Sequence, residues 1–173
     1  MRFLKGFGIL GLALLIGGSV AWAETGKKAS VDISKVFDEY QKTKDNDRIL
    51  QGAGRKKEEE RDAMVREVRQ MKDELALIAD EAAKAKKQEA LNAKVKTLEE
   101  FDRTTRQGLA EQRNTVLREI FKDIDDTVKR YGDKNGFDFV FNERALLYTN
   151  PQYDVTKDIV EELNKNYKGG KKA

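Results

Sequence analysis

The sequence contains no cysteine and no histidine among its 173 residues. Without cysteine the chain has no disulfide bond, no thiolate nucleophile and no cysteine to which a lipid anchor could be attached. Without histidine it lacks the side chain that most often serves as a general base or as a transition-metal ligand. After residue 23 the only serines are Ser30 and Ser34. We therefore expect no enzymatic activity and no cofactor.

Proline and glycine, the two residues that break helices, are absent from a long stretch in the middle of the sequence. Neither residue occurs between Arg55 and Gln107, and the single proline is Pro151. Alanine, glutamate, lysine, arginine, glutamine and leucine dominate this long stretch, and all six favour helix. The many carboxylates lie on a predicted solvated helix surface, where no pocket would support acid–base chemistry.

The first 23 residues have the composition of an export signal. A short basic start, "MRFLK", precedes the uncharged stretch "GFGILGLALLIGGSV" and then "AWA", which has the small-x-small form of a cleavage site. An uncleaved membrane anchor is the alternative, but the apolar stretch is short for a stable span. We expect residues 1–23 to be a cleaved signal peptide and the rest to be exported.

Charge of one sign is not in excess. Residues 1–23 carry Arg2 and Lys5 but no acidic residue, so without them 32 basic residues stand against 31 acidic ones. The two signs are interspersed along the chain, as on a solvated helix surface and unlike a nucleic-acid-binding patch. We expect no binding to nucleic acid and at most weak contact with an anionic membrane or with lipopolysaccharide.

Residues 42–131 are predicted to form a helical arm. Apolar residues step by four and three, which indicates a coiled-coil seam, at Met64, Val68, Met71, Leu75, Ile78, Ala82 and Ala85. A single straight helix would be about 140 Å long and would separate the strand pattern near residue 31 from those after residue 136. A hairpin with its tip near 79–86 brings the strand patterns together, whereas a rod would have to pair its strands with another chain. We favour the hairpin.

Three glycines fall at the same height if the arm turns back near residue 81. Gly52 and Gly54 then lie opposite Gly108. A glycine inside a helix costs about 1 kcal/mol relative to alanine. This level of the arm is either a flexible joint or a tolerated imperfection of a solvated helix.

A small body is predicted from the two ends, residues 24–41 and 132–168, with a flexible tail at 169–173. Val31 and Ile33 alternate with polar residues as in a strand, and "FDFVF" and "ALLYT" indicate two more strands around a turn at "NER". A last amphipathic helix follows, with one apolar face, at Val155, Ile159, Leu163 and Tyr167. The expected fold is therefore α+β: a long antiparallel helical hairpin projecting from a β-rich body.

Two stretches resemble the Skp/OmpH family of periplasmic chaperones. They are "VDISKVFDEYQKTK" near the start and "GFDFVFNERALLYTNPQYDVTKDIVEELNK" at the end. The resemblance covers residues 29–167, and its terminal segments are more specific than the helical middle. It implies a homotrimer in which strands of three copies close a barrel and three arms enclose a cavity. The oligomer interface would then contain Val31, Ile33, Phe137, Phe139, Val140, Phe141 and Tyr148.

The resemblance implies an ATP-independent holdase that keeps unfolded outer-membrane β-barrel proteins from aggregating. Such clients expose alternating apolar residues and free strand edges, and many weak contacts inside a cavity could hold them. Methionine adapts to varied surfaces, so the expected client contacts are Met64, Met71, Leu75, Leu77 and Ile78. Packing within the seam is the alternative for each of them, although Leu77 lies off the seam. An exported coiled-coil spacer or adaptor with one fixed partner is the rival function.

Overall fold

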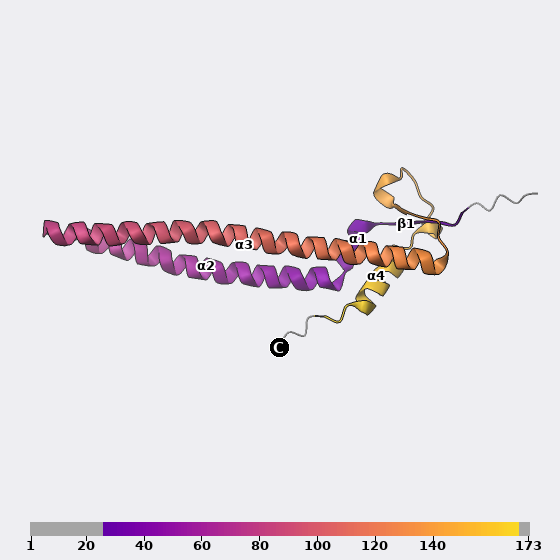
Figure 1. Cartoon of the computed structure of the whole chain (residues 1–173), viewed down its shortest axis with the longest axis horizontal. Coiled ribbons are helices and arrows are strands. Elements are labelled where there is room, and N and C mark those ends of the chain that lie inside the picture. Colours follow the sequence, from indigo (N-terminus) through magenta and orange to yellow (C-terminus); the bar gives the residue numbers. More distant parts are fainter. Residues whose placement is uncertain (1–25, 170–173) are drawn as a thin grey trace, which may run out of the picture.

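Two long antiparallel helices form most of the molecule (Figure 1). The computed structural model describes residues 26–169, so the predicted signal peptide and all but the first residue of the predicted tail lie outside the described residues. The elements are, in chain order, β1 (Lys28–Val31), α1 (Ile33–Glu39), α2 (Gln41–Ala76), α3 (Glu81–Asn135), β2 (Phe139–Asn142), the 3₁₀ turns η1 (Glu143–Ala145) and η2 (Pro151–Tyr153), and α4 (Thr156–Asn166).

The helical hairpin predicted from the sequence is confirmed, and the straight rod is wrong. Helices α2 and α3 lie side by side and project away from the end where β1, α1 and α4 gather (Figure 1). The register follows from ion pairs across the hairpin, such as Glu74 with Lys87 and Arg61 with Asp102 at 2.9 Å. With 55 residues, α3 is about 80 Å long at 1.5 Å per residue.

The turn at the tip occupies residues 77–80, at the early edge of the predicted range 79–86. Asp80 explains its position, because its carboxylate accepts a hydrogen bond of 2.7 Å from the backbone N–H of Ala83 and so caps the start of α3. The turn therefore forms without a glycine or a proline.

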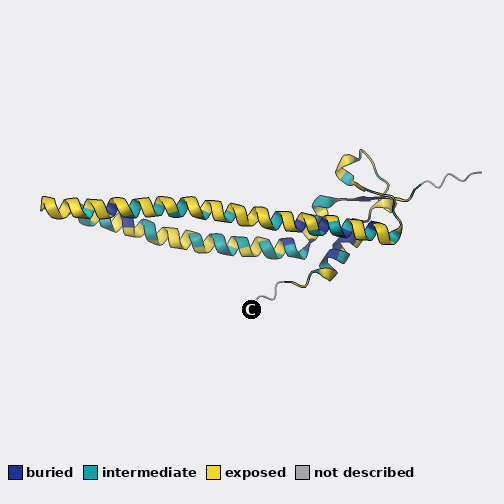
Figure 2. Cartoon of the chain, viewed as in Figure 1, coloured by how far each residue is buried: buried dark blue, intermediate teal, exposed yellow. Residues whose placement is uncertain are grey.

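The core of the protein lies at the other end, in the body. Its members come from β1, α1, the last part of α3 and α4, and its fully buried apolar side chains include Val36, Ile120 and Ile159. Figure 2 shows these buried positions gathered where α1, α3 and α4 meet. Ile120 and Ile124 belong to this core although the predicted boundary at residue 131 assigned them to the arm.

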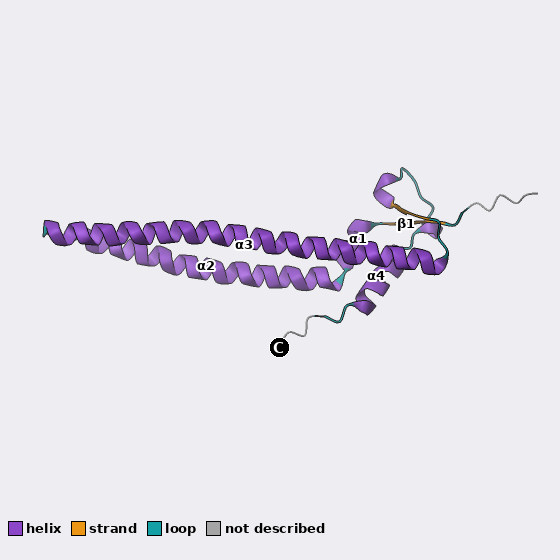
Figure 3. Ribbon diagram, viewed as in Figure 1, coloured by secondary structure: helices purple, strands orange, loops and turns teal. Residues whose placement is uncertain are grey.

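The sheet is smaller than expected. β1 pairs with β2 in parallel, with Lys28 opposite Phe139 and Val31 opposite Asn142 (Figure 3 shows the two strands). Ile33 is not in the strand: it is the first residue of α1, because the Asp32 carboxylate accepts hydrogen bonds from the N–H groups of Ser34 and Lys35 and caps a helix there.

The predicted third strand, "ALLYT" at 145–149, is wrong for the single protomer, and so is the tight hairpin with "FDFVF". The 3₁₀ turn η1 follows β2, and residues 146–150 have no regular structure. The other edge of β1 is occupied instead by a bridge from Ser30 to Asp154, and the N–H of Val155 donates to the carbonyl of Ser30. The segment therefore pairs with neither strand of its own chain, and the outer edge of β2 stays open.

The last helix matches the prediction. Val155, Ile159 and Leu163 are buried on the inner side of α4, and Tyr167 packs against the core. The C-terminus of α3 is closed by Gly136 at φ 66°, a left-handed conformation that glycine adopts without strain, and the N–H of Phe137 returns to the carbonyl of Gly132. None of the helices in residues 26–169 is long and apolar enough to cross a membrane.

Candidate functional site

The arm exposes most of its length to solvent (Figure 2). Between Gln51 and Thr115 the only buried side chains are Val68 and Leu91, one on each helix. An antiparallel pair of helices buries only one stripe per helix, so every other face stays available. The arm is therefore a large, adaptable surface and contains little core of its own.

The structure divides the predicted client-contact residues into two groups. Met64, Met71, Leu75 and Ile78 are half-buried at the level of the seam, which fits packing within the hairpin at least as well as contact with a client. Leu77 differs, because it lies in the turn after α2 and is 86 % exposed. It is the projecting apolar side chain at the tip.

Ion pairs flank the seam and hold the two helices in register. Lys94 lies 2.6 Å from Glu67, and Lys87 donates to Glu74 nearer the tip. The hydrogen bond from Lys87, together with one from Gln70, lowers the pKa of the exposed Glu74 carboxyl. Such exposed pairs contribute little to stability, so they select the register of the hairpin more than they strengthen it.

Two of the three predicted joint glycines, Gly54 and Gly108, line neighbouring hollows of the arm. Gly54 lines a hollow of about 320 Å³ and Gly108 a neighbouring one of about 430 Å³, and Ala53 lies across from Gly108. A Cβ added at any of the three glycines would meet nothing within 4 Å, so close packing does not require glycine there. Both helices continue through this level without a break.

Phe101 marks the same level, and the sequence prediction missed it. Its ring lines both hollows, and the ammonium group of Lys57 lies 5.3 Å from its centroid. Phe101 is the only aromatic residue between Tyr40 and Phe121, a fact that the sequence alone could have shown. At this level of the arm, side chains therefore fill the space between the helices incompletely, and the hollows are lined by glycines and one aromatic ring.

A polar cluster ties the base of the arm to the body. The hydroxyl of Tyr40 donates to Asp123 at 3.1 Å, and Lys42 donates to the same carboxylate at 2.8 Å. Burial, followed by the charge of Asp123, raises the pKa of the Tyr40 hydroxyl. Burial by itself would lower the pKa of Lys42. The hydrogen bonds and charges of Asp123 and Glu119 have the larger combined effect, so the pKa of Lys42 is raised. The cluster fixes the angle at which α2 leaves the body, and the sequence prediction missed it.

The predicted interface residues also fall into two groups. Val31 is buried in the core of its own protomer, Ile33 and Val140 pack against that core, and Phe137 stacks on Tyr131. Phe139, Phe141 and Tyr148 are exposed, and the rings of Phe139 and Phe141 stack on each other at 5.8 Å. The second group is more exposed and therefore more available to another chain. Leu147 and Tyr153, which the prediction omitted, are exposed as well.

Within residues 26–169 no group of three or more acidic side chains is placed to hold a metal ion. The candidate functional site is thus a pair of surfaces: the exposed arm with its tip, and the aromatic face of the body.

Three comparisons bear on these surfaces. Residues 27–163 match the family described as Outer membrane protein (OmpH-like). The chain is 27% identical over 164 residues to Chaperone protein Skp of Yersinia enterocolitica, a match that covers 89% of this chain and 94% of the relative. A crystal structure of an OmpH-like outer membrane chaperone from Caulobacter crescentus CB15 superposes with a TM-score of 0.76 at 14% identity, covering 95% of this chain and 93% of that one. At that identity the structural likeness supports the fold alone.

Proposed function

The chain belongs to the OmpH-like outer membrane protein family, and from this premise we propose that it is an ATP-independent periplasmic holdase. It would bind unfolded outer-membrane β-barrel proteins in a cavity between helical arms and prevent their aggregation. The relative named as a chaperone supports this role in the coarser form of a chaperone.

The observation that carries the proposal is the arm itself. A hairpin of 36 and 55 residues that buries only two apolar side chains along most of its length presents far more surface than folding requires. An unfolded β-barrel protein offers alternating apolar residues and free strand edges, which many weak contacts can hold with high effective concentration. Binding of this kind needs no nucleotide.

Capture in a cavity needs more than one arm, so the proposal includes a homotrimer assembled through the bodies. Phe139, Phe141 and Tyr148 would lie in the interface, while Val31 and Ile33 would support it from within the protomer. The outer edge of β2 supports this arrangement, because open strand edges are usually covered or paired. The periplasm is the compartment in which such clients travel, and the predicted signal peptide would direct the chain there.

Aggregation of a diluted client tests the proposal. A urea-unfolded β-barrel protein is diluted with and without the chain, in the absence of nucleotide, and light scattering is recorded. A holdase suppresses scattering at one trimer per client, whereas an exported spacer with a fixed partner leaves it unchanged. The second result would overturn the proposed function.

The tip gives a sharper version of the same test. Leu77→Ser removes an apolar side chain that makes almost no intrachain packing, so the hairpin should fold normally. We expect about twofold more chain to be needed for the same protection, since one weak contact among many is lost. Ala79→Ser in the same turn is the matched control. Equal protection by all three proteins would remove Leu77 from the client surface.

A further inference from the structure

A break separates α1 from α2 at a place where the sequence has no helix-breaking residue. Tyr40, the residue between the two helices, has an extended backbone with φ −67° and ψ 125°. The surrounding stretch "VFDEYQKTK" contains neither glycine nor proline, and none of its residues excludes a helix. The side chain of Tyr40 makes no capping hydrogen bond to α2. Local sequence therefore does not account for the break, so a contact from elsewhere in the chain must hold it.

Asn164 of α4 makes that contact. Its side-chain oxygen accepts a hydrogen bond of 2.7 Å from the backbone N–H of Gln41, the first residue of α2. Its side-chain nitrogen donates at 3.3 Å to the backbone carbonyl of Glu39, the last residue of α1. Helix ends leave backbone donors and acceptors without intrahelical partners, and here one carboxamide serves one group of each kind. Asn164 thus replaces hydrogen bonds that a continuous helix would make within itself.

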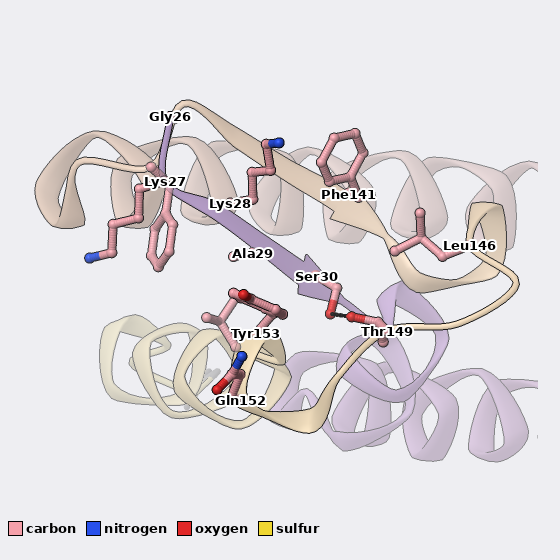
Figure 4. A pocket seen from close by; sticks show the side chains of 12 residues that line it. Gly26, Lys27, Lys28, Ala29, Ser30, Phe141, Leu146, Thr149, Gln152 and Tyr153 are labelled. Carbon is pink, nitrogen blue, oxygen red and sulfur yellow. Dashed lines mark hydrogen bonds between the residues drawn. The ribbon is translucent and has the colours of Figure 1, made fainter. Parts of the chain in front are cut away.

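The other end of α4 is tied to the strand side of the body, which fixes the position of Asn164. The hydroxyls of Ser30 and Thr149 lie 3.2 Å apart where the chain approaches α4 (Figure 4). The backbone N–H of Asp32 donates to the hydroxyl of Thr156, the first residue of α4, at 2.9 Å. The middle of α4 packs in the core. The carboxamide is therefore held in place by the body and not by the arm.

An unbroken helix through Tyr40 is the competing arrangement. The N–H of Gln41 would then bond to the carbonyl four residues earlier and would not need Asn164. Thr43 favours this alternative, because it is 4 % exposed and its hydroxyl has no hydrogen-bond partner within residues 26–169. In an unbroken helix this hydroxyl would be able to donate to the carbonyl of Glu39, a bond that threonine often makes in helices. The break therefore costs one hydrogen bond at Thr43, and Asn164 compensates for it.

We propose that Asn164 is a positioning residue of the arm: it holds the break at Tyr40 and so fixes the direction in which α2 leaves the body. When its two hydrogen bonds are lost, Tyr40 becomes helical, α1 and α2 join, and the start of α2 turns away from α3. The hydrogen bonds to Asp123 act on the same junction from α3, whereas Asn164 bonds to the backbone of both helices. In a holdase this residue determines how far the arms stand apart at their base, a consequence that rests on the proposed function.

The carbon chemical shifts of Tyr40 test the proposal without any client, because they report whether its backbone is extended or helical. Asn164→Leu removes both hydrogen bonds at nearly constant size, and we expect the Tyr40 shifts to move from extended to helical values. Asn164→Asp keeps the acceptor for Gln41, and its charge suits the N-terminus of α2, so Tyr40 should stay extended. Asn166→Leu, at an exposed position of the same helix, is the matched control and should leave Tyr40 unchanged.

Two more variants make the result independent of the leucine side chain. Asn164→Ala removes the same two bonds without adding apolar surface and should also give helical Tyr40 shifts. Thr43→Val replaces the buried hydroxyl by a methyl group, so the break no longer costs a hydrogen bond, and it should return Tyr40 to extended shifts in the Asn164→Leu background. Extended Tyr40 shifts in both Asn164→Leu and Asn164→Ala would overturn the proposal, and so would helical shifts in Asn164→Asp.

A distance measurement follows the arm itself. Because the chain has no cysteine, spin labels can be placed only at Arg48→Cys on α2 and Asn114→Cys on α3, both at exposed positions. The labelled chain is refolded with an excess of the same chain without cysteines, so that distances between copies do not contribute. We expect the distance between the labels to lengthen with Asn164→Leu and to keep its wild-type value with Asn164→Asp. An unchanged distance beside helical Tyr40 shifts would overturn the link between the break and the direction of α2.

Light scattering of a diluted β-barrel client separates this inference from the proposed function. We expect Asn164→Leu to lose part of the protection that wild type and Asn164→Asp give. Equal protection by all three proteins would overturn the role of Asn164 in holding clients. No protection by wild type would overturn the proposed function, while the Tyr40 shifts and the label distance would still decide whether Asn164 positions the arm.

Discussion

The body and the arm use apolar side chains differently. In the body, Val36, Ile120 and Ile159 are completely or almost completely buried by four elements that approach from different directions. In the arm, Val68 and Leu91 are covered by one partner helix each, and the half-buried residues around them stay open on one side. Apolar side chains of similar kinds therefore form a closed core at one end of the molecule and a half-exposed stripe at the other.

This difference follows from the number of neighbours that a helix has. A helix packed against one other helix buries a narrow stripe, whereas the end of α3 meets α1, α4 and β2 and buries a wide one. The body thus holds the fold in place, and the arm offers surface. The predictions below test whether this division holds, from the largest expected effect to the smallest.

The largest effect is expected when a charge is placed on the aromatic face of the body. Phe139→Asp would bury an unpaired carboxylate in the proposed interface, at a cost of several kcal/mol, and dissociate the trimer. The protomer should remain folded, because Phe139 is 55 % exposed in the single chain. Sedimentation equilibrium at micromolar concentration measures the mass.

Ile49→Asp is the matched control for this change, since Ile49 lies in α2 and is 58 % exposed. It should leave the mass unchanged. If both variants remain trimeric, Phe139 does not lie in an interface; if both dissociate, assembly depends on the arm as well as on the body.

A leucine-to-alanine change at each end compares the two regions within one protomer. Leu163→Ala in α4 should destabilise the protein by about 2–5 kcal/mol, because it removes a fully enclosed side chain and leaves a cavity. Leu98→Ala in the arm should cost about 1 kcal/mol, since that side chain is only half-buried and already borders solvent. Urea denaturation followed by circular dichroism gives both values. Equal losses would show that the arm has a core comparable to that of the body.

The sequence predicted the arm better than the body, and the reason is physical. Seam spacing, the lack of helix breakers and the last amphipathic helix are local patterns, and the structure confirms the hairpin and α4. The strand at Ile33 failed because Asp32 caps a helix, a local signal that alternation concealed. The strand at 145–149 failed because strand formation depends on pairing with an edge, and this segment does not pair with the open edge of β2, which alternation alone could not show.

The site was predictable to the extent that it depends on helix faces. Leu77 was separated from the seam correctly, and the hairpin alone predicted that Gly54 and Gly108 lie near each other. Burial in the body depends on how four elements meet, so Val31 could not be distinguished from Phe139 by alternation. Asp123 is 83 residues from Tyr40 and 81 residues from Lys42 in the sequence, and no local pattern joins it to them.

The glycine level is predicted to be the joint of the arm. Replacing Gly52, Gly54 and Gly108 by alanine removes about 1 kcal/mol of helix weakness per site, and each added methyl group meets open space. In wild type, amides of residues 50–58 and 104–112 should exchange with solvent faster than those of 64–75, and they should slow in the triple variant. The body and its assembly should be unaffected.

Client size reports on the function of this joint. If the cavity must widen for large clients, the triple variant protects small β-barrel proteins and fails with large ones. Uniform amide exchange along both helices of the wild-type protein would show that the arm has no joint at this level. Equal protection of small and large clients by the triple variant would show that the joint is not needed for function. Gly52→Ala alone removes helix weakness without changing either hollow, because Gly52 lines neither of them. It therefore distinguishes the effect of helix weakness from the effect of filling the hollows.

The smallest predicted effect is a loss of stability in alkali that acts through the body. Tyr131 donates a hydrogen bond of 2.6 Å to Asp158 and joins α3 to α4. Burial, followed by this bond, raises the pKa of the Tyr131 hydroxyl from 10.0 to about 12. The folded state therefore keeps a proton that the unfolded state releases, so this contribution is fully present below pH 10 and is lost as the pH rises towards 12.

Tyr131→Phe isolates the contribution, because Tyr40, whose pKa burial also raises, is the same in both proteins. At pH 8 the variant should be about 1 kcal/mol less stable than wild type, the usual net value of one hydrogen bond. The difference should shrink as the pH approaches 12, because ionised Tyr131 repels Asp158. Asp158→Asn keeps the tyrosine but removes that charge, so its stability should fall less steeply in alkali. Urea denaturation at successive pH values measures the stability of all three proteins, and a wild-type advantage that grows with pH would contradict the predicted sign.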